Sequence, residues 1–442
     1  MRRIWIRHSL IAGACALAVL ASAAPVAAQS NSDKPKATDV GITASEIHIA
    51  VIADVDNPIV PALFQGAVDG VKGAAAYLNS KAGGGGVAGR KVVVDFIDSK
   101  LNPNTSRNAV ITACQNDFAM IGSSVVFLTN FEDAVNCKDQ AGAATGLPDM
   151  PSFVVGVTES CSPVTFPLNP PQLDCATKDQ SPQTYRNNAG PSKYLLKKFG
   201  NLHGAFVYGN DSKDAQRGSR SIIDSEIAVG IKADQITGIS GRAPQSAYTP
   251  VVAKMKQDGS NYGTAIGDNA AIQMRSEAQL QGVSSNVVWS CSQCYSKTDA
   301  AAPALNGSWV NLIYLPYQEA STNPTLQAFV KYVGLAKADQ FAVYGWSATL
   351  AFADAAKAVV TKHGVNGLTR KALLTQGIPT LTKFDAGGML GARDITGKIP
   401  SSCFVMMHLT NGKYVRTFPS KKGTFDCNPK NSVTTKADYI GG

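Results

Sequence analysis

The clearest pattern of hydrophobic and polar positions lies between residues 46 and 98 and predicts a strand, a helix and a second strand. The β-branched run at residues 47–52 stops at the turn formers of residues 54–58. Apolar residues then recur at steps of three and four and share one helical stripe: Phe64, Ala67, Val68, Val71, Ala74, Ala75 and Leu78. Glycines end this helix at residues 83–86. Residues 91–98 (KVVVDFID) form a nearly continuous apolar strand, as expected for a parallel sheet covered on both faces.

The same alternation of strands and helices continues along the chain. Further strands are predicted at residues 118–121, 153–155, 203–208, 231–236, 264–266, 287–289 and 310–315, and a long helix at 340–360. A closing hairpin is expected around Asn411-Gly412, a pair that favours a two-residue turn. The fold class is therefore α/β, with two doubly wound lobes joined by a multi-strand hinge.

The domain boundaries follow from composition and from the restarts of this pattern. Residues 1–28 have basic Arg2, Arg3 and Arg7, an apolar core and small residues at their end, which is typical of a signal peptide. The apolar run is shorter than the roughly 20 residues of a membrane span. Whether Cys15 is lipidated stays open. The further divisions are a disordered linker (29–40), lobe 1 (41–185 plus 321–390), lobe 2 (186–320 plus 391–430) and a tail (431–442).

The charge and the cysteines point to an exported protein that does not bind nucleic acid. The net charge of +9 includes three arginines of the signal peptide, and the remaining Lys and Arg residues are scattered. Eight of the nine cysteines lie in the mature chain, an even number that favours disulfides. Our interpretation pairs sequence neighbours: Cys114 with Cys137, Cys161 with Cys175, Cys291 with Cys294, and Cys403 with Cys427. Cys291-Ser-Gln-Cys294 is alternatively a redox motif or half of a zinc site, but the sequence offers no second ligand pair.

The sequence offers no convincing catalytic or cofactor motif. Gly84-x-Gly86-x-x-Gly89 has the letters of a dinucleotide fingerprint, but it follows a helix and precedes a strand, the reverse of the required context. Gly-x-Ser-x-Gly, His-Glu-x-x-His and Walker motifs do not occur. We therefore expect no catalytic residue, no metal and no cofactor, and we expect the protein not to be an enzyme. An exported hydrolase stays open as a less favoured alternative.

The order and spacing of three segments carry a resemblance to a known family. "GITASEIHIAVIAD", "AAAYLNSKAGGGGVAGRKV" and "VVVDFIDSKLNPNTSRNA" resemble the opening of type I periplasmic binding proteins, the Leu/Ile/Val-binding (branched-chain amino acid) family of ABC transporters. The resemblance implies a monomer in the periplasm or at the cell surface. It would close its lobes on a small-molecule ligand and deliver that ligand to ABC transporter permease subunits. A ligand sensor for a signalling partner remains an alternative.

The candidate ligand residues follow predicted strands, because α/β sheets bind ligands beyond the carboxyl ends of their strands. The resemblance implies that Ser123, Ser124 and Thr158 hold a ligand carboxylate, and that an acid of lobe 2 holds its ammonium group. The loop after Trp289 contains no acid, so Asp211 or Asp268 would serve. This departure makes an amine-free carboxylate credible beside an amino acid. The full candidate set is Ser123, Ser124, Thr158, Tyr208, Asp211, Asp268, Asn269 and Trp289.

Overall fold

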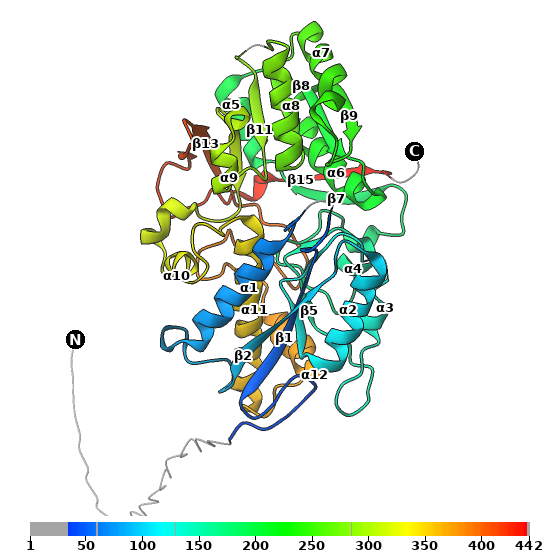
Figure 1. The fold of residues 1–442 in the computed structure, drawn as a ribbon, viewed down its shortest axis with the longest axis vertical. Coiled ribbons are helices and arrows are strands. Elements are labelled where there is room, and N and C mark those ends of the chain that lie inside the picture. The colour runs from blue at the N-terminus through cyan, green and yellow to red at the C-terminus, as the bar shows by residue number, and fades with distance from the viewer. Residues whose placement is uncertain (1–33, 59–60, 129, 284, 440–442) are drawn as a thin grey trace, which may run out of the picture. The chain divides into compact units, whose positions relative to one another are not determined.

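A computed structural model describes residues 34–58, 61–128, 130–283 and 285–439 (Figure 1). The predicted signal peptide and the first residues of the predicted linker lie outside this part of the chain. Among the described residues, no helix has both the length and the apolar character that crossing a membrane requires.

The first sheet is centred on β1 (Glu46–Ala53), which is buried along most of its length. It pairs in parallel with β2 (Lys91–Asp98), β3 (Ala119–Ile121) and β4 (Ser124–Val125). β5 (Asp149–Met150) and β6 (Phe153–Val154) lie beside β3 and β4. The predicted strand, helix, strand unit at the start of the chain is therefore confirmed.

The predicted third strand is followed, after a kink, by a second short strand. This second strand contains Ser124, which was expected to lie in a loop. Gly122 separates β3 from β4 and has φ of +73°, a conformation that glycine adopts readily. A Cβ atom here would also lie 2.3 Å from Val71 Cγ2. Ser124 pairs with Ala53 and Phe153, so it lies within strand β4 and not in a loop after the third strand.

In the described part of the chain, a set of α-helices packs with the first sheet, and we call this assembly lobe 1. They are α1 (Gln65–Asn79), α2 (Pro103–Asn116), α3 (Glu132–Val135), α4 (Val157–Ser160), α10 (Pro324–Tyr332), α11 (Gln340–His363) and α12 (Arg370–Ala372). α1 and α11 pack at close range: a Cβ atom on Gly345 of α11 would lie 2.3 Å from Ala67 O of α1. The chain thus returns late in the sequence to place α11 beside α1 (Figure 1).

The second sheet has the order β14-β13-β12-β11-β10-β8-β9, and with its helices we call it lobe 2. Its strands are β8 (His203–Gly209), β9 (Lys232–Ile239), β10 (Tyr262–Ala265), β11 (Val288–Cys291), β12 (Trp309–Leu312), β13 (Val405–Thr410) and β14 (Lys413–Phe418). Its helices are α5 (Gly190–Phe199), α6 (Lys213–Ala228), α7 (Thr249–Asp258), α8 (Asp268–Leu280) and α9 (Lys297–Ala301). The hairpin turn at Asn411 and Gly412 is confirmed, with φ of 50° and 72°.

A small third sheet lies where the chain first passes from lobe 1 to lobe 2. It pairs β7 (Gln183–Asn188) with β15 (Ser432–Ala437) in antiparallel register. The next crossing segment contains Glu319, which forms a buried two-pronged ion pair with Arg416 of β14, at 2.5 and 2.6 Å. Several chain crossings therefore join the lobes, in agreement with the predicted multi-strand hinge.

Two predicted divisions of the chain need correction, because the fold holds part of the predicted disordered linker and most of the predicted tail. In the predicted linker, Asp39 is 5% exposed and accepts a hydrogen bond from Arg370 N at 2.7 Å. Arg90 Nη2 donates to Lys36 O at 2.7 Å. The predicted tail includes β15, and the ring of Tyr439 lies 5.0 Å from that of Tyr185. Polar composition suggested disorder in the linker, but it carries no information on partners that are distant in sequence.

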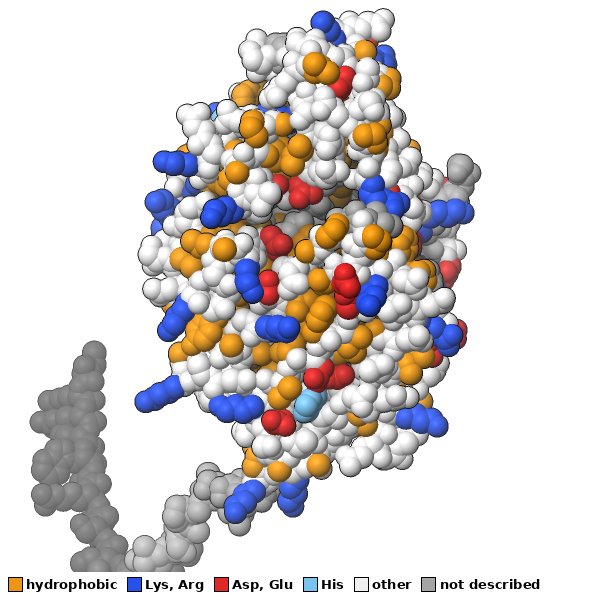
Figure 2. All heavy atoms as spheres, viewed as in Figure 1, with side chains coloured by type: hydrophobic (Ala, Val, Ile, Leu, Met, Phe, Trp, Pro, Cys, Tyr) orange, Lys and Arg blue, Asp and Glu red, His pale blue; other side chains and the backbone are white. Residues whose placement is uncertain are grey.

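The four disulfides pair the sequence neighbours: Cys114–Cys137, Cys161–Cys175, Cys291–Cys294 and Cys403–Cys427. Cys291 and Cys294 bond to each other, so neither has a free thiolate for zinc. On the face shown in Figure 2, basic and acidic side chains are interspersed and do not gather into a patch of one sign. That face has the mixed charge of an ordinary solvated surface.

Candidate functional site

A cavity of about 390 Å³ lies between lobe 1 and lobe 2, at the carboxyl ends of strands from both sheets. Parallel α/β sheets bind ligands at these ends because backbone groups and helix starts converge there. Lobe 1 provides Phe153, Val154, Val155, Val157, Ser160, Asn169, Pro170, Pro171, Gln172, Leu173, Gln340 and Tyr344. The hinge and lobe 2 provide Tyr185, Gly209, Asp211, Asp214, Ala215, Arg217, Gly218, Ser219, Ile222, Gly241, Ile266, Ser292, Gln293, Asn311, Ile313 and Tyr314.

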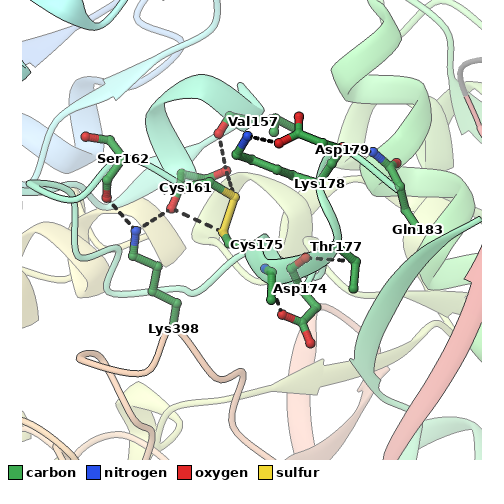
Figure 3. The surroundings of a disulfide bond; sticks show 12 residues. Val157, Cys161, Ser162, Asp174, Cys175, Thr177, Lys178, Asp179, Gln183 and Lys398 are labelled. Atoms are coloured by element: carbon green, nitrogen blue, oxygen red, sulfur yellow. Dashed lines mark hydrogen bonds and ion pairs between the residues drawn. A yellow bond between two sulfur atoms is a disulfide. The ribbon is translucent and has the colours of Figure 1, made fainter. Parts of the chain in front are cut away.

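One wall of the cavity is a loop closed by the Cys161–Cys175 disulfide (Figure 3). Residues 169–173 of this loop line the cavity. Lys398 Nζ donates to the backbone oxygens of Ser160 and Ser162, on either side of Cys161, at 2.9 and 2.6 Å. Burial lowers the pKa of Lys398 to about 8. The Cys161–Cys175 disulfide and the two hydrogen bonds from Lys398 fix the first residues of this loop in position.

The opposite wall is helix α6 of lobe 2. The side chain of Ser212 accepts a hydrogen bond from Ala215 N and so caps the start of the helix. Asp214 and Arg217 follow on the cavity side, and Arg217 Nη1 donates to Asp214 Oδ1 at 2.6 Å. The Arg217 side chain is 8% exposed and that of Asp214 is 35% exposed. The α6 wall therefore carries a buried cation with a more exposed anion beside it.

Asp211, the second acid of the cavity, has its carboxylate engaged. Oδ1 accepts from Ser240 Oγ at 2.5 Å, and Oδ2 accepts from Gly241 N at 2.8 Å. Burial raises the pKa of Asp211, but the hydrogen bonds from Ser240 and Gly241 and the charge of Arg242 outweigh it, so the pKa is lowered overall. Asp211 is thus an anion that orders the loop after β9.

Of the eight predicted ligand residues, only Asp211 is among those that line the cavity. In lobe 1, Ser123 Oγ accepts a hydrogen bond from Ile52 N at 3.2 Å. Ser124 is fully buried within β4, and Thr158 is an exposed residue of α4. None of these three residues is among those that line the cavity; strand pairing at β4 accounts for the position of Ser124.

The predicted residues of lobe 2 have other partners. The guanidinium of Arg220 lies 5.3 Å from the ring of Tyr208, and that of Arg275 lies 5.4 Å from the ring of Trp289. Asn269 Nδ2 donates to Gly241 O at 2.8 Å, and Asp268 is exposed at the start of α8. None of these four side chains belongs to the cavity lining.

The sequence analysis did not identify Asp214 and Arg217. Their spacing of three residues is that of an ordinary surface ion pair on a helix. A faint signal exists, because the buried face of α6 is unusually polar: Arg217, Ser219, Ser221, Ile223, Ser225 and Glu226. A helix face of this kind needs polar partners or a polar cavity beside it.

One compact group of metal-ligand types occurs among the described residues: His48, Asp95 and Asp117 in lobe 1. His48 Nδ1 and Asp95 Oδ2 are 2.7 Å apart and form a hydrogen bond. Burial, with the Asp95 carboxylate beside it, raises the pKa of Asp117 and so favours the protonated form of this carboxyl. A hydrogen bond joins His48 to Asp95, one buried oxygen of Asp117 has no hydrogen-bond partner among the described residues, and none of the three residues lines the cavity.

Comparison with solved structures identifies the fold. A leucine binding protein, LivK, from Thermotoga maritima is 15% identical, with a TM-score of 0.64 and coverage of 87% of this chain and 99% of that chain. A fatty acid ABC transporter substrate-binding protein from Thermomonospora curvata is 15% identical, with a TM-score of 0.63 and coverage of 87% and 97%. A solute binding protein from R. palustris in complex with benzoate is 17% identical, with a TM-score of 0.60 and coverage of 86% and 99%.

Comparison by sequence identifies the family. No curated protein matches the chain. The family model described as "Periplasmic binding protein" matches residues 46–413, which spans both lobes and the hinge crossings between them. Together with the mixed α/β architecture of two sheets joined by several crossings, this match establishes that the chain is a member of the periplasmic binding protein family, with the type I fold.

Proposed function

We propose that the chain is an extracytoplasmic solute-binding protein that captures a small polar ligand, an amino acid or a related carboxylate, between its two lobes. The observation that carries the proposal is the cavity, because both lobes line it. A ligand there contacts both lobes at once, and only such differential contact can favour a closed arrangement over an open one.

Similar solved structures support solute capture for an ABC transporter. One from Desulfitobacterium hafniense is an ABC transporter substrate-binding protein in complex with Leu, and the one from R. palustris is in complex with benzoate. The ligand-loaded form of this chain would dock on an ABC permease in the periplasm or at the cell surface. Four disulfides support an oxidising compartment. We propose further that the protein acts as a monomer.

The cavity chemistry supports binding without catalysis. Its described lining contains no histidine or cysteine, and its charged groups are Asp211, Asp214 and Arg217. Each of the two acids already accepts hydrogen bonds from neighbouring groups. Acid/base catalysis requires a group poised to exchange a proton with the substrate, and nucleophilic catalysis requires a nucleophile beside a base.

Thermal unfolding of the mature, oxidised protein against a panel of solutes tests this function. The panel contains amino acids, aliphatic and aromatic carboxylates, neutral amides and sugars. A ligand present at about a hundred times its dissociation constant adds about 2.7 kcal/mol of stability, a shift of a few degrees. Failure of every solute class to shift the unfolding temperature would refute the proposal.

A cavity-filling variant separates binding in the cavity from binding elsewhere. Ala215 lines the cavity on α6, and Lys213 is an exposed residue of the same helix. Ala215→Trp should abolish the shift because the indole occupies the space of the ligand. Lys213→Trp, the matched control, should leave the shift intact. Equal shifts in the two variants would place the ligand outside the cavity.

A further inference from the structure

One buried cation in the cavity has unused hydrogen-bonding capacity. Arg217 lines the cavity, and its side chain is 8% exposed. Nη1 donates to Asp214, whereas Nε is buried and has no hydrogen-bond partner among the described residues. A buried N–H group without an acceptor costs free energy. An acceptor brought by a ligand would remove that cost.

The shape of the guanidinium group specifies the kind of acceptor. Nε and Nη2 form one edge of a planar fork, and this edge matches the two oxygens of a carboxylate. Asp214 bonds to Nη1, which leaves the Nε edge for a second carboxylate. One arginine can bridge two carboxylates in this way, one from the protein and one from the ligand.

The cavity does not offer a matching site for an ammonium group. Its acids are Asp214, which Arg217 neutralises, and Asp211, whose oxygens accept from Ser240 and Gly241. The described lining from lobe 1 contains no Asp or Glu, and its polar side chains are three amides, a serine and the tyrosine Tyr344. An ammonium group therefore lacks an acid of its own, whereas an apolar or uncharged substituent needs none.

The rest of the cavity suits a hydrocarbon body. Phe153 and Val157 of lobe 1 face the space that Ile222, Ile266 and Tyr314 line from lobe 2. Small-ligand sites are mostly apolar, with a few placed polar groups that fix orientation. In this cavity Arg217 is the charged group available for that task.

We propose that Arg217 anchors the carboxylate of an amine-free organic acid whose hydrocarbon body fills the cavity between the lobes. The inference rests on the proposed function, since it requires solute capture at this site. It places the anchor on α6 of lobe 2. The resemblance seen in the sequence implies instead an anchor on lobe 1, at Ser123, Ser124 and Thr158.

Isothermal titration with matched ligand sets tests the anchor. Each set shares one hydrocarbon: 3-phenylpropanoate, L-phenylalanine and 3-phenylpropanamide, and likewise 4-methylpentanoate, L-leucine and 4-methylpentanamide. The wild type should bind an acid of the panel at least about tenfold more tightly than the corresponding amino acid or amide. Arg217→Gln should weaken acid binding about 10- to 100-fold, the range expected for hydrogen bonds to a charged group, and should leave amide binding unchanged.

Two further variants control for charge and folding. Arg220 lies on the same helix but contacts the rings of Tyr208 and Tyr439 and does not line the cavity. Arg220→Gln removes the same charge from α6 and should keep acid affinity. If Arg217→Gln alone does not fold, Asp214→Asn combined with Arg217→Gln removes both charges and leaves no unpaired acid.

The outcomes distinguish the inference from the proposed function. Tighter binding of the amino acids, or full acid affinity in the Arg217 variants, overturns the Arg217 anchor while solute capture stands. Binding of neutral solutes alone has the same consequence. If no solute of any class binds the wild type, both proposals fail.

Discussion

Replacing Glu226 with glutamine is expected to remove a pH-dependent loss of stability in lobe 2. Glu226 lies on α6, the helix that carries Arg217, and it is buried against β10. Tyr262 Oη donates to its Oε2 at 2.6 Å. Burial raises the pKa of Glu226 to about 7, and the hydrogen bond from Tyr262 offsets only part of that rise.

The magnitude follows from the pKa change. The unfolded chain releases this proton near the ordinary glutamate pKa of 4.5, whereas the folded chain keeps it up to about pH 7. Between these values the folded state binds more protons, so the free energy of unfolding falls as pH rises. At about 1.4 kcal/mol per pKa unit, the full loss above pH 7 is about 3 kcal/mol. The contribution is fully present below about pH 4.5.

Urea unfolding at several pH values between 4.5 and 8 measures this slope. Glu226→Gln keeps a side chain of the same shape without a titrating proton, so the wild type should lose about 3 kcal/mol relative to the variant across this range. Glu132→Gln, at an exposed position of α3, removes the same charge and should leave the slope unchanged. Parallel slopes for the wild type and Glu226→Gln would refute the reasoning.

Two other predictions concern the cavity wall and the packing of lobe 1. Replacing both Cys161 and Cys175 with serine frees the loop that lines the cavity. Urea unfolding should then show a loss of about 3 kcal/mol in the free energy of unfolding, the chain-entropy value for a loop of roughly 15 residues. An unchanged unfolding midpoint would contradict this prediction. Gly345→Ala should cost about 1–3 kcal/mol, because its Cβ atom would lie 2.3 Å from Ala67 O. Gly218→Ala in α6, where the nearest atom is 4.0 Å away, should be neutral or stabilising in the same assay, and equal losses would argue against the close approach.

The fold could be predicted because its signals are local. The stripe in α1, the strands on either side of it and the turn at Asn411 and Gly412 each depend on residues within a few positions of one another. Such periodicity is set by the helix and strand repeats themselves. The order of these elements was then enough to indicate the two lobes.

The cavity residues were harder to predict because they depend on where a strand ends. Ser123 and Ser124 follow a glycine that looks like a strand end, but the chain kinks and pairs again at β4. Strand β4 contains only Ser124 and Val125, yet with this short strand paired in the sheet both serines are buried. Boundaries of this kind are the least reliable part of a sequence-based prediction.

The burial of Arg217, and the ordered contacts of the predicted linker and tail, depend on residues that are distant in sequence. Arg217 is buried in a cavity that lobe 1 also lines, which a helix pattern alone does not reveal. Asp39 is buried beside Arg370, and β15 pairs with β7. In each case the partner lies far outside the few neighbouring positions that local composition and periodicity describe.

A crystal structure of the protein with the tightest-binding organic acid of the panel tests the central claim most directly. The account predicts one ligand in the cavity, in contact with both lobes, with its carboxylate within hydrogen-bonding distance of Arg217 Nε and its hydrocarbon against Phe153 and Tyr314. A ligand bound elsewhere on the protein, or one that contacts a single lobe, would contradict it.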